Sequence, residues 1–208
     1  MKNIKIIGIA GGSGSGKTRL VKNILSEVDE NKITSIEIDS YYKDLKKISF
    51  EERCKNNFDH PNSIDFELLH KDLEKILDNQ STKTPVYDYK THTRKDEFKK
   101  ISTQKIILIE GILTFYDKRV RDILDMKIFV DTDEKARIER RIKRDIRSRK
   151  RTYESIMHQF QSTVIPMHNK FIQPTKKYAD FIITRGVKNT VAMEKVISNI
   201  ISMVNTKN

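Results

Sequence analysis

The stretch from Ile4 to Thr18 constrains this chain more than any other, because a short β-branched apolar run breaks there into glycines and ends in Lys-Thr. The spacing Gly11-x-x-x-x-Gly16-Lys17-Thr18 fits a phosphate-binding P-loop. Glycines let backbone N–H groups approach phosphate oxygens, and the helix N-terminus that follows favours anions. We expect Lys17 to reach the β- and γ-phosphates and the Thr18 hydroxyl to sit on Mg²⁺.

The surroundings of this loop separate a phosphate cradle from a glycine-rich turn that happens to contain a lysine. Apolar residues precede the loop, and others follow it at helical spacing, beginning with Leu20, Val21 and Ile24. A strand, a loop and a helix in that order favour nucleotide binding. The predicted cradle consists of Gly11, Gly12, Ser13, Gly14, Ser15, Gly16, Lys17 and Thr18.

The composition limits the number of domains, the kinds of partner and the cellular compartment to be expected for this chain. With 208 residues we expect one compact domain spanning 1–208. The formal charge of +12 fits an enzyme for polyphosphates as well as a nucleic-acid binder. Cys54 is the single cysteine, so an internal disulfide and a cysteine-based zinc site are excluded and a reducing compartment is expected. No stretch reaches membrane-spanning length, which predicts a cytoplasmic protein with no membrane partner.

A second strand is predicted over 34–38, with Asp39 at its carboxyl end. Ligands bind at the carboxyl ends of strands in open α/β sheets, so Asp39 could face the P-loop and serve as a general base for an acceptor hydroxyl. An aspartate that caps the next turn is an equal alternative. The polar residues 43–58 predict a loop and a short helix, and a helix over about 63–77 is expected to begin at Ser63 as its N-cap.

A hairpin excursion is predicted over about 84–103, where side-chain character alternates. Tyr87, Tyr89 and His92 could stack on a flat ring, but from these residues alone a surface hairpin with ordinary aromatics is the favoured alternative. Beyond the hairpin, the apolar run 104–109 predicts a buried strand that ends in Glu110, where P-loop proteins place the carboxylate that organises Mg²⁺. A further strand is predicted over 126–130.

The helix that follows is strongly basic, since nine of the fifteen residues from Arg137 to Arg151 are Lys or Arg. Ile138, Ile142 and Ile146 form an apolar seam along it. The helix could bind nucleic acid, or it could be a lid over about 137–152 whose arginines clamp a transferring phosphoryl group. The P-loop elsewhere in the chain favours the lid.

The remaining chain predicts two helices and a strand. A helix from Tyr153 is expected to stop before Pro166, a strand covers 181–184, and a closing helix follows the turn 185–189. Strands that alternate with helices predict an α/β fold with a doubly wound parallel sheet of the P-loop NTPase type.

Taken together, the motifs resemble those of the uridine-cytidine kinase family over nearly the whole chain. The resembling segments are GGSGSGKT (11–18), IDSYY (38–42), NFDHPNSID (57–65), PVYDYKTHTRK (85–95), EGILTFY (110–116), FVDTD (129–133), RRIKRDIRSRKR (140–151), QPTKKYAD (173–180) and RGVKN (185–189). Members of that family transfer the γ-phosphate of ATP or GTP to the 5′-hydroxyl of uridine or cytidine with Mg²⁺, and many are tetramers. The resemblance therefore implies a pyrimidine nucleoside kinase that forms a homo-oligomer.

Position by position, the resemblance also implies roles for individual residues. Asp39 is the expected base, Lys17 and Arg144 act on the phosphoryl group, and Thr18 with Glu110 organises the metal. Asp59 and Arg141 hold the ribose hydroxyls, while Arg149 belongs to the phosphate-facing lid. The expected ring-reading residues are Tyr87, His92, Arg151 and Gln159, the expected ring-packing residues are Phe58 and Tyr89, and the expected donor-side residues are Arg185 and Lys188. Lys188 stands where relatives often carry an acidic residue, which leaves the preference for ATP or GTP open.

Three rival functions remain to be separated. A sister kinase of the same architecture would act on a phosphorylated pentose or pantothenate, which need no ring-reading set. A GTP switch lacks support because neither an Asn-Lys-x-Asp nor an Asp-x-x-Gly motif of that class is found. A nucleic-acid-binding protein using the arginine helix would show steeply salt-dependent binding. We expect a small-molecule nucleoside as the partner and no nucleic acid.

Overall fold

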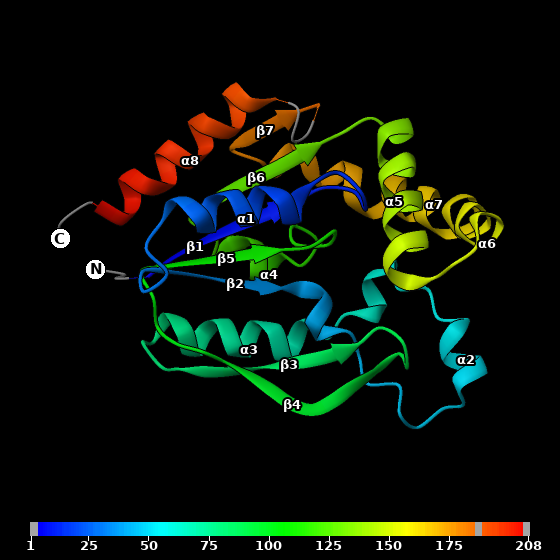
Figure 1. The fold of residues 1–208 in the computed structure, drawn as a ribbon. Coiled ribbons are helices and arrows are strands. Elements are labelled where there is room, and N and C mark those ends of the chain that lie inside the picture. Colours follow the sequence, from blue (N-terminus) through cyan, green and yellow to red (C-terminus); the bar gives the residue numbers. More distant parts are fainter. Residues whose placement is uncertain (1–3, 186–188, 206–208) are drawn as a thin grey trace.

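The centre of the fold is a five-stranded parallel sheet in the order β2-β5-β1-β6-β7 (Figure 1). The computed structural model describes residues 4–185 and 189–205. The strands of this sheet are β1 (Lys5–Ala10), β2 (Ile33–Glu37), β5 (Ile106–Glu110), β6 (Met126–Asp131) and β7 (Phe181–Thr184). The predicted doubly wound sheet is thereby confirmed.

Alternating side chains of the central strands supply two hydrophobic layers, one on each face. Ile107 and Ile109 of β5 belong to one cluster, and Ile106 and Leu108 belong to the other. A parallel strand covered on both faces reads as a continuous apolar run, which is why the run 104–109 could be assigned from sequence. The second cluster includes the apolar faces of α1 (Lys17–Glu27) and α8 (Thr190–Asn205).

The opposite face is covered by α3 (Phe66–Leu77) and α4 (Lys118–Asp122), which contribute to the first cluster. The helix α3 does not begin at Ser63 as predicted. Its N-cap is Asp65, whose side chain accepts a hydrogen bond from the N–H of Leu68 at 3.1 Å. Ser63 instead ends the 3₁₀ turn η2 (Pro61–Ser63), where its hydroxyl donates to the carbonyl of His60 at 2.7 Å.

A separate two-stranded hairpin, β3 (Thr82–Asp88) and β4 (Thr93–Ile101), runs beneath α3 in Figure 1. The 3₁₀ turn η1 (Ile38–Tyr41) leads from β2 toward it, and the short helix α2 (Phe50–Cys54) lies beyond the hairpin's tip. Both the hairpin and the short helix were predicted. The tip of the hairpin therefore lies on the side of the molecule toward which the carboxyl ends of the sheet strands point (Figure 1).

The arginine-rich helix α5 (Glu134–Arg149) follows β6 and packs against a long helical run. That run contains α6 (Tyr153–Gln159), η3 (Phe160–Val164), α7 (Ile165–Met167), η4 (His168–Ile172) and η5 (Gln173–Tyr178). It does not stop before Pro166 as predicted. π-Helical turns η3 and η4 lie on either side of α7, and their i→i−5 hydrogen bonds accommodate a residue that lacks an N–H.

Two further observations complete the architecture. The predicted apolar seam on α5 is incompletely covered, since Ile146 is 46% exposed while Ile138 and Ile142 are half-buried. Within the described ranges, no helix combines the length and the apolar character needed to cross a membrane.

Candidate active site

The loop between β1 and α1 has the backbone geometry that its glycines permit. Gly14 and Gly16 have φ values of 77° and 110°, in the region that side chains with a Cβ disfavour. A Cβ on Gly14 would lie 2.4 Å from the carbonyl oxygen of Arg137. The glycine is therefore required both by the backbone conformation and by the close approach of α5.

Lys17 is the first residue of α1 and is buried, with its side chain turned back toward the loop. Its Nζ donates hydrogen bonds to the carbonyls of Gly11 at 3.0 Å and Gly12 at 3.1 Å. Burial lowers the pKa of the Lys17 amine, while the negative charges of Glu110 and Asp39 oppose that shift. The amine is thus held in the loop beside two carboxylates.

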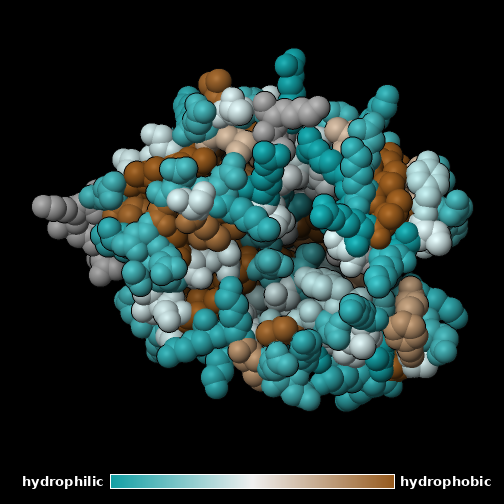
Figure 2. Space-filling model, viewed as in Figure 1, coloured by the Kyte–Doolittle hydropathy of each residue, from teal (hydrophilic) through white to brown (hydrophobic). Residues whose placement is uncertain are grey.

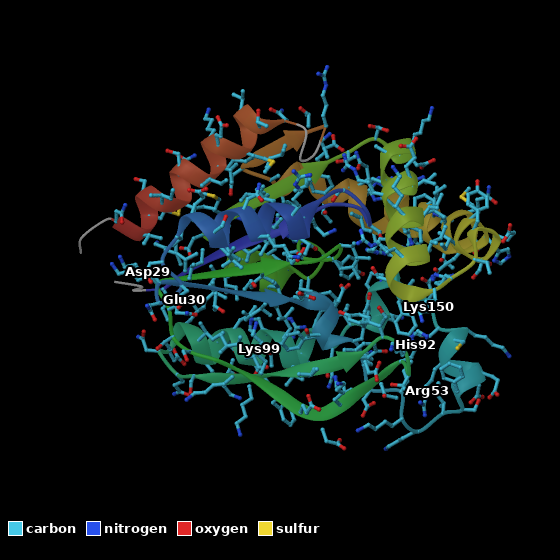
Figure 3. All side chains as sticks on the ribbon, viewed as in Figure 1. Asp29, Glu30, Arg53, His92, Lys99 and Lys150 are labelled. Atoms are coloured by element: carbon cyan, nitrogen blue, oxygen red, sulfur yellow. The ribbon has the colours of Figure 1, made fainter. Side chains whose placement is uncertain are left out.

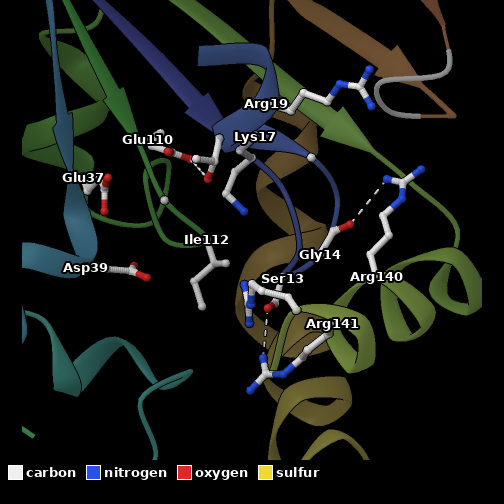
Figure 4. Close-up of a pocket in the computed structure, with 14 residues that line it drawn as sticks. Ser13, Gly14, Lys17, Arg19, Glu37, Asp39, Glu110, Ile112, Arg140 and Arg141 are labelled. Atoms are coloured by element: carbon white, nitrogen blue, oxygen red, sulfur yellow. Dashed lines mark hydrogen bonds between the residues drawn. The ribbon is translucent and has the colours of Figure 1, made fainter. Parts of the chain in front are cut away.

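A cavity of about 400 Å³ opens beside this loop (Figure 4). In the space-filling view, the same face of the molecule is hollowed near its middle and its rim is largely hydrophilic (Figure 2). The cavity has a P-loop side, an acidic side and a basic side. Its lining residues are Ser13, Gly14, Gly16, Lys17, Thr18, Arg19, Glu37, Asp39, Glu110, Gly111, Ile112, Arg140, Arg141 and Arg144.

Three carboxylates form the acidic side. Glu37 ends β2 and Glu110 ends β5, and the two are paired in register across the parallel strands. Asp39 follows in η1 and also lines the cavity. Thr18 Oγ1 donates to Glu110 Oε2 at 3.2 Å, which joins the P-loop to this side. Burial raises the pKa of both Glu110 and Glu37, and the charge of Asp39 adds to the shift in each case.

Helix α5 supplies the basic side and is bonded to the P-loop along its first half. Arg140 donates to the carbonyl of Ser15 at 2.9 Å, and Arg141 donates to the hydroxyl of Ser13 at 2.9 Å. The close-up shows the Arg141–Ser13 contact, together with a longer hydrogen bond of 3.4 Å from Arg140 to the carbonyl of Gly14 (Figure 4). The predicted lid is therefore attached at its base, and Arg144 lines the cavity from the next turn.

One buried carboxylate gathers several of the lid arginines. Asp145 is 0% exposed, and its Oδ1 lies 2.8 Å from Arg144 Nε, while its Oδ2 lies 3.5 Å from Arg141 Nε and 3.8 Å from Arg151 Nη1. Gln159 Oε1 accepts hydrogen bonds from both Arg141 and Arg151. Arg141, Arg151 and Gln159, which lie on different segments in sequence, are thus brought together.

The aromatic members of the predicted ring-binding set form a cluster next to η1, apart from Arg151 and Gln159. Phe58 stacks on His92 with ring centroids 4.9 Å apart, and Tyr87 lies 5.5 Å from Tyr89. Tyr42 contacts both Phe58 and Tyr87, at 5.1 and 5.2 Å. The hydroxyl of Tyr87 is buried and has no hydrogen-bond partner among the described residues.

Asp59 directly follows Phe58 of this cluster in the chain and is buried. Burial raises the pKa of its carboxyl, while Arg141 opposes that shift. The charge of Asp39 raises the same pKa and Lys17 lowers it, so Asp59 shares the electrostatic environment of the cavity. The charges of Asp39 and Asp59 both contribute to a raised pKa of Tyr42, behind the larger effect of burial.

The structure describes the predicted donor-side and lid residues only in part. Arg185 follows β7 with a φ of 60° and lines a separate surface hollow with Asn189, Thr190 and neighbours. Lys188 and the side chain of Arg149 lie outside the described part of the chain.

Sequence reasoning missed several residues around the site. Glu37 carried a usable signal, because it lies two residues before Asp39 at the end of the same predicted strand. Arg140 was noted only as one basic residue of the helix. Asp145 and Tyr42 gave no local signal, since their positions depend on how α5, α6 and the hairpin pack together.

A parallel sheet in this strand order, a P-loop, and carboxylates at the ends of adjacent strands define a P-loop phosphotransferase. The model of the phosphoribulokinase / uridine kinase family matches residues 6–192. The chain belongs to that family.

Curated relatives agree with this assignment, and a solved structure shares the fold. A uridine kinase of Clostridium botulinum (strain 657 / Type Ba4) is 49% identical over 96% of this chain and 97% of its own length. A uridine kinase of Halalkalibacterium halodurans is 47% identical over 97% of this chain and 96% of its own length. The D-glycerate 3-kinase of Cryptococcus neoformans var. grubii has a TM-score of 0.63 at 15% identity, covering 84% of this chain and 81% of the other, which is a likeness of fold alone.

Proposed function

We propose that this chain is a nucleoside kinase that transfers the γ-phosphate of ATP or GTP to the 5′-hydroxyl of uridine or cytidine, giving UMP or CMP. The names of its curated relatives support this activity. The observation that carries the proposal is that one cavity contains the P-loop lysine and Asp39, with an aromatic cluster beside it.

The residues around the loop fit a magnesium–nucleotide complex. Mg²⁺ is usually held by a few protein oxygens, waters and the substrate phosphates, and the Thr18 hydroxyl with Glu110 offers such a set. When bound, the metal neutralises charge on the β- and γ-phosphates. Lys17 would leave its loop carbonyls to bind phosphate oxygens, and Arg144 and Arg149 would stabilise the charge of the moving phosphoryl group.

Asp39 is the proposed general base. It would accept the proton of the 5′-hydroxyl as that oxygen attacks, in the manner of the catalytic aspartate of other kinases. Asp59 and Arg141 would hold the two ribose hydroxyls, and the Arg141–Gln159 contact orients the guanidinium for that task. A nucleoside without the 2′-hydroxyl would leave one of these buried groups without its hydrogen-bond partner. That loss costs about 1 to 3 kcal/mol, which favours ribose over 2′-deoxyribose.

Recognition of the pyrimidine would fall to the hairpin and the helix α6. Tyr87, His92, Arg151 and Gln159 would read the ring edge, and Phe58 and Tyr89 would pack its faces. The buried hydroxyl of Tyr87, which has no hydrogen-bond partner among the described residues, supports this assignment because a polar group of the ligand could bond to it.

The remaining features are also proposals. Arg185 and Lys188 would lie on the donor-base side, with the choice between ATP and GTP undecided. We further propose a homo-oligomer, a tetramer by family resemblance, that acts in the cytoplasm.

A substrate panel tests the function. Purified protein with ATP and Mg²⁺ should release ADP when uridine or cytidine is added, and should give little release with 2′-deoxyuridine, ribulose 5-phosphate or pantothenate. Stimulation by ribulose 5-phosphate alone would overturn the nucleoside assignment in favour of a sister activity. Salt-dependent binding of single-stranded RNA without nucleotide would instead favour a nucleic-acid function.

A further inference from the structure

Arg94 connects the hairpin to the turn that carries Asp39. It lies on β4, directly opposite Tyr87 in the hairpin register. Its Nε donates to the carbonyl of Tyr42 at 2.8 Å, and its Nη2 donates to the carbonyl of Tyr41 at 3.2 Å. The same Nη2 lies 3.2 Å from Asp65 Oδ2. One guanidinium therefore joins β4, the end of η1 and the N-cap of α3.

The two carbonyls belong to the turn that begins at Asp39. The N–H of Tyr42 donates to the Asp39 carbonyl at 3.3 Å, which closes the turn. The N–H of Asp65 donates to the carbonyl of Tyr41 at 2.9 Å, so Arg94 and Asp65 share that acceptor. The guanidinium is therefore bonded to the backbone of the turn that presents Asp39 to the cavity.

A second set of contacts, centred on Asp72 of α3, joins η1 to the start of the hairpin. Tyr41 donates its hydroxyl to Asp72 Oδ2 at 3.0 Å, and Thr82 donates to Asp72 Oδ1 at 2.8 Å. The Asp72 side chain is buried, so η1, α3 and the start of β3 form one rigid frame. At the opposite end, Arg53 binds the Thr91 carbonyl at 3.2 Å, beside His92 at the hairpin tip (Figure 3).

We infer that Arg94 is a positioning residue that fixes the distance between the ring-reading hairpin and the base Asp39. The inference rests on the proposed function and adds a residue that does not line the cavity. A nucleoside held by its ring at the hairpin then meets the base at its 5′-hydroxyl in the correct geometry. An arginine suits this role because its planar fork donates from Nε and Nη2 at once, which the single ammonium of lysine does not reproduce.

A double-mutant cycle between Arg94→Lys and Asp39→Asn tests this, with phosphorylation of uridine measured in single turnover at saturating ATP. In the protein with Asp39 intact, Arg94→Lys should lower the rate by about 10- to 100-fold, the loss typical of a small misplacement of a reacting group. In the Asp39→Asn background, the same change should lower the rate by less than about twofold, because residues that act through one another are not additive.

Control variants separate this from a loss of folding. Lys95→Met, at the next residue of the same strand, should leave the rate unchanged, because its ammonium pairs with exposed Glu97 at 4.0 Å and does not line the cavity. If Arg94→Lys unfolds, Asp65→Asn replaces it, since an asparagine still caps α3 while the ion pair with Arg94 is lost. The inference predicts that Asp65→Asn, like Arg94→Lys, lowers the rate when Asp39 is present and has little effect in the Asp39→Asn background.

The outcomes distinguish the two proposals. Equal fold-losses in both backgrounds, or no loss from Arg94→Lys in folded protein, overturn the positioning role and leave the kinase assignment standing. A wild-type protein that phosphorylates neither uridine nor cytidine overturns the proposed function, and the inference falls with it.

Discussion

The buried carboxylate of Asp145 offers a direct test of how the lid arginines are held. Asp145→Asn keeps the shape of the side chain and removes its charge. In the folded protein this carboxylate lies 2.8 Å from Arg144 Nε, 3.5 Å from Arg141 Nε and 3.8 Å from Arg151 Nη1. The substitution therefore leaves closely spaced guanidinium groups without their shared counter-charge.

The size of the effect follows from these contacts. Removing one member of a buried ion pair costs about 3 to 5 kcal/mol, and a hydrogen bond to a charged group is worth about 1.5 to 3 kcal/mol. The Arg144 side chain is 43% exposed, so water screens part of its interaction. We expect a loss of about 2 to 4 kcal/mol in the free energy of unfolding. Because Arg141 and Arg151 lose their orientation, kcat/KM for uridine should fall by about 100-fold.

Urea unfolding and steady-state kinetics on the same preparations measure both quantities. Asp122→Asn is the matched control, since this carboxylate is 53% exposed and pairs with Lys118 on the surface of α4. The control should lose no more than about 1 kcal/mol and keep its activity. An Asp145→Asn protein that matches the control in both assays would show that the carboxylate does not organise the lid.

Three further predictions follow from single groups. Tyr87→Phe removes a buried hydroxyl that lacks a partner, so stability should stay level or rise by about 1 kcal/mol while KM for uridine increases; a clear loss of stability by urea unfolding would contradict this. Burial, reinforced by Arg137, lowers the pKa of His168 from 6.5 to about 4. The folded state thus favours the neutral imidazole. The contribution of this preference to the free energy of unfolding is fully present above pH 6.5 and is lost as the pH falls toward 4. Between pH 7.5 and pH 5, His168→Gln should therefore lose about 2 kcal/mol less free energy of unfolding than wild type. Parallel curves of unfolding free energy against pH for the two proteins would contradict the lowered pKa of His168. Gly14→Ala places a Cβ 2.4 Å from the carbonyl of Arg137 at a φ of 77°, so ATP affinity in a binding titration should fall more than about tenfold; unchanged affinity would mean that the loop adapts.

Local patterns predicted the central sheet well. The strand, glycine loop and helix of residues 5–27 and the buried strand β5 each carry their own signal, because a parallel strand covered on both faces is apolar throughout. Where two local signals compete, the sequence is ambiguous. Both Ser63 and Asp65 could cap α3, and Asp65 does so because the Ser63 hydroxyl is already bonded within η2.

Pro166 illustrates a different limit. A proline ordinarily ends a helix, but π-helical turns before and after it let the chain continue from Tyr153 to Tyr178. No residue pattern signals these turns, in which Phe160, Val164 and Ile172 are buried.

For the site, motif spacing could name groups such as Lys17, Asp39 and Glu110, which the fold brings to one cavity. It could not find Asp145 or Arg94, because their importance arises from partners that are distant in sequence or on other elements. The chemical roles of all these residues remain predictions.

The central claim is that Asp39 activates a nucleoside hydroxyl beside the P-loop. Transfer of labelled γ-phosphate from ATP to uridine, followed by identification of the product and compared between wild type and Asp39→Asn, tests it most directly. The account predicts 5′-UMP from wild type and a loss of about 1,000-fold or more in kcat for Asp39→Asn, with the dissociation constant for uridine nearly unchanged. Label that appears only as inorganic phosphate, or an Asp39→Asn protein that forms 5′-UMP at the wild-type rate, would contradict it.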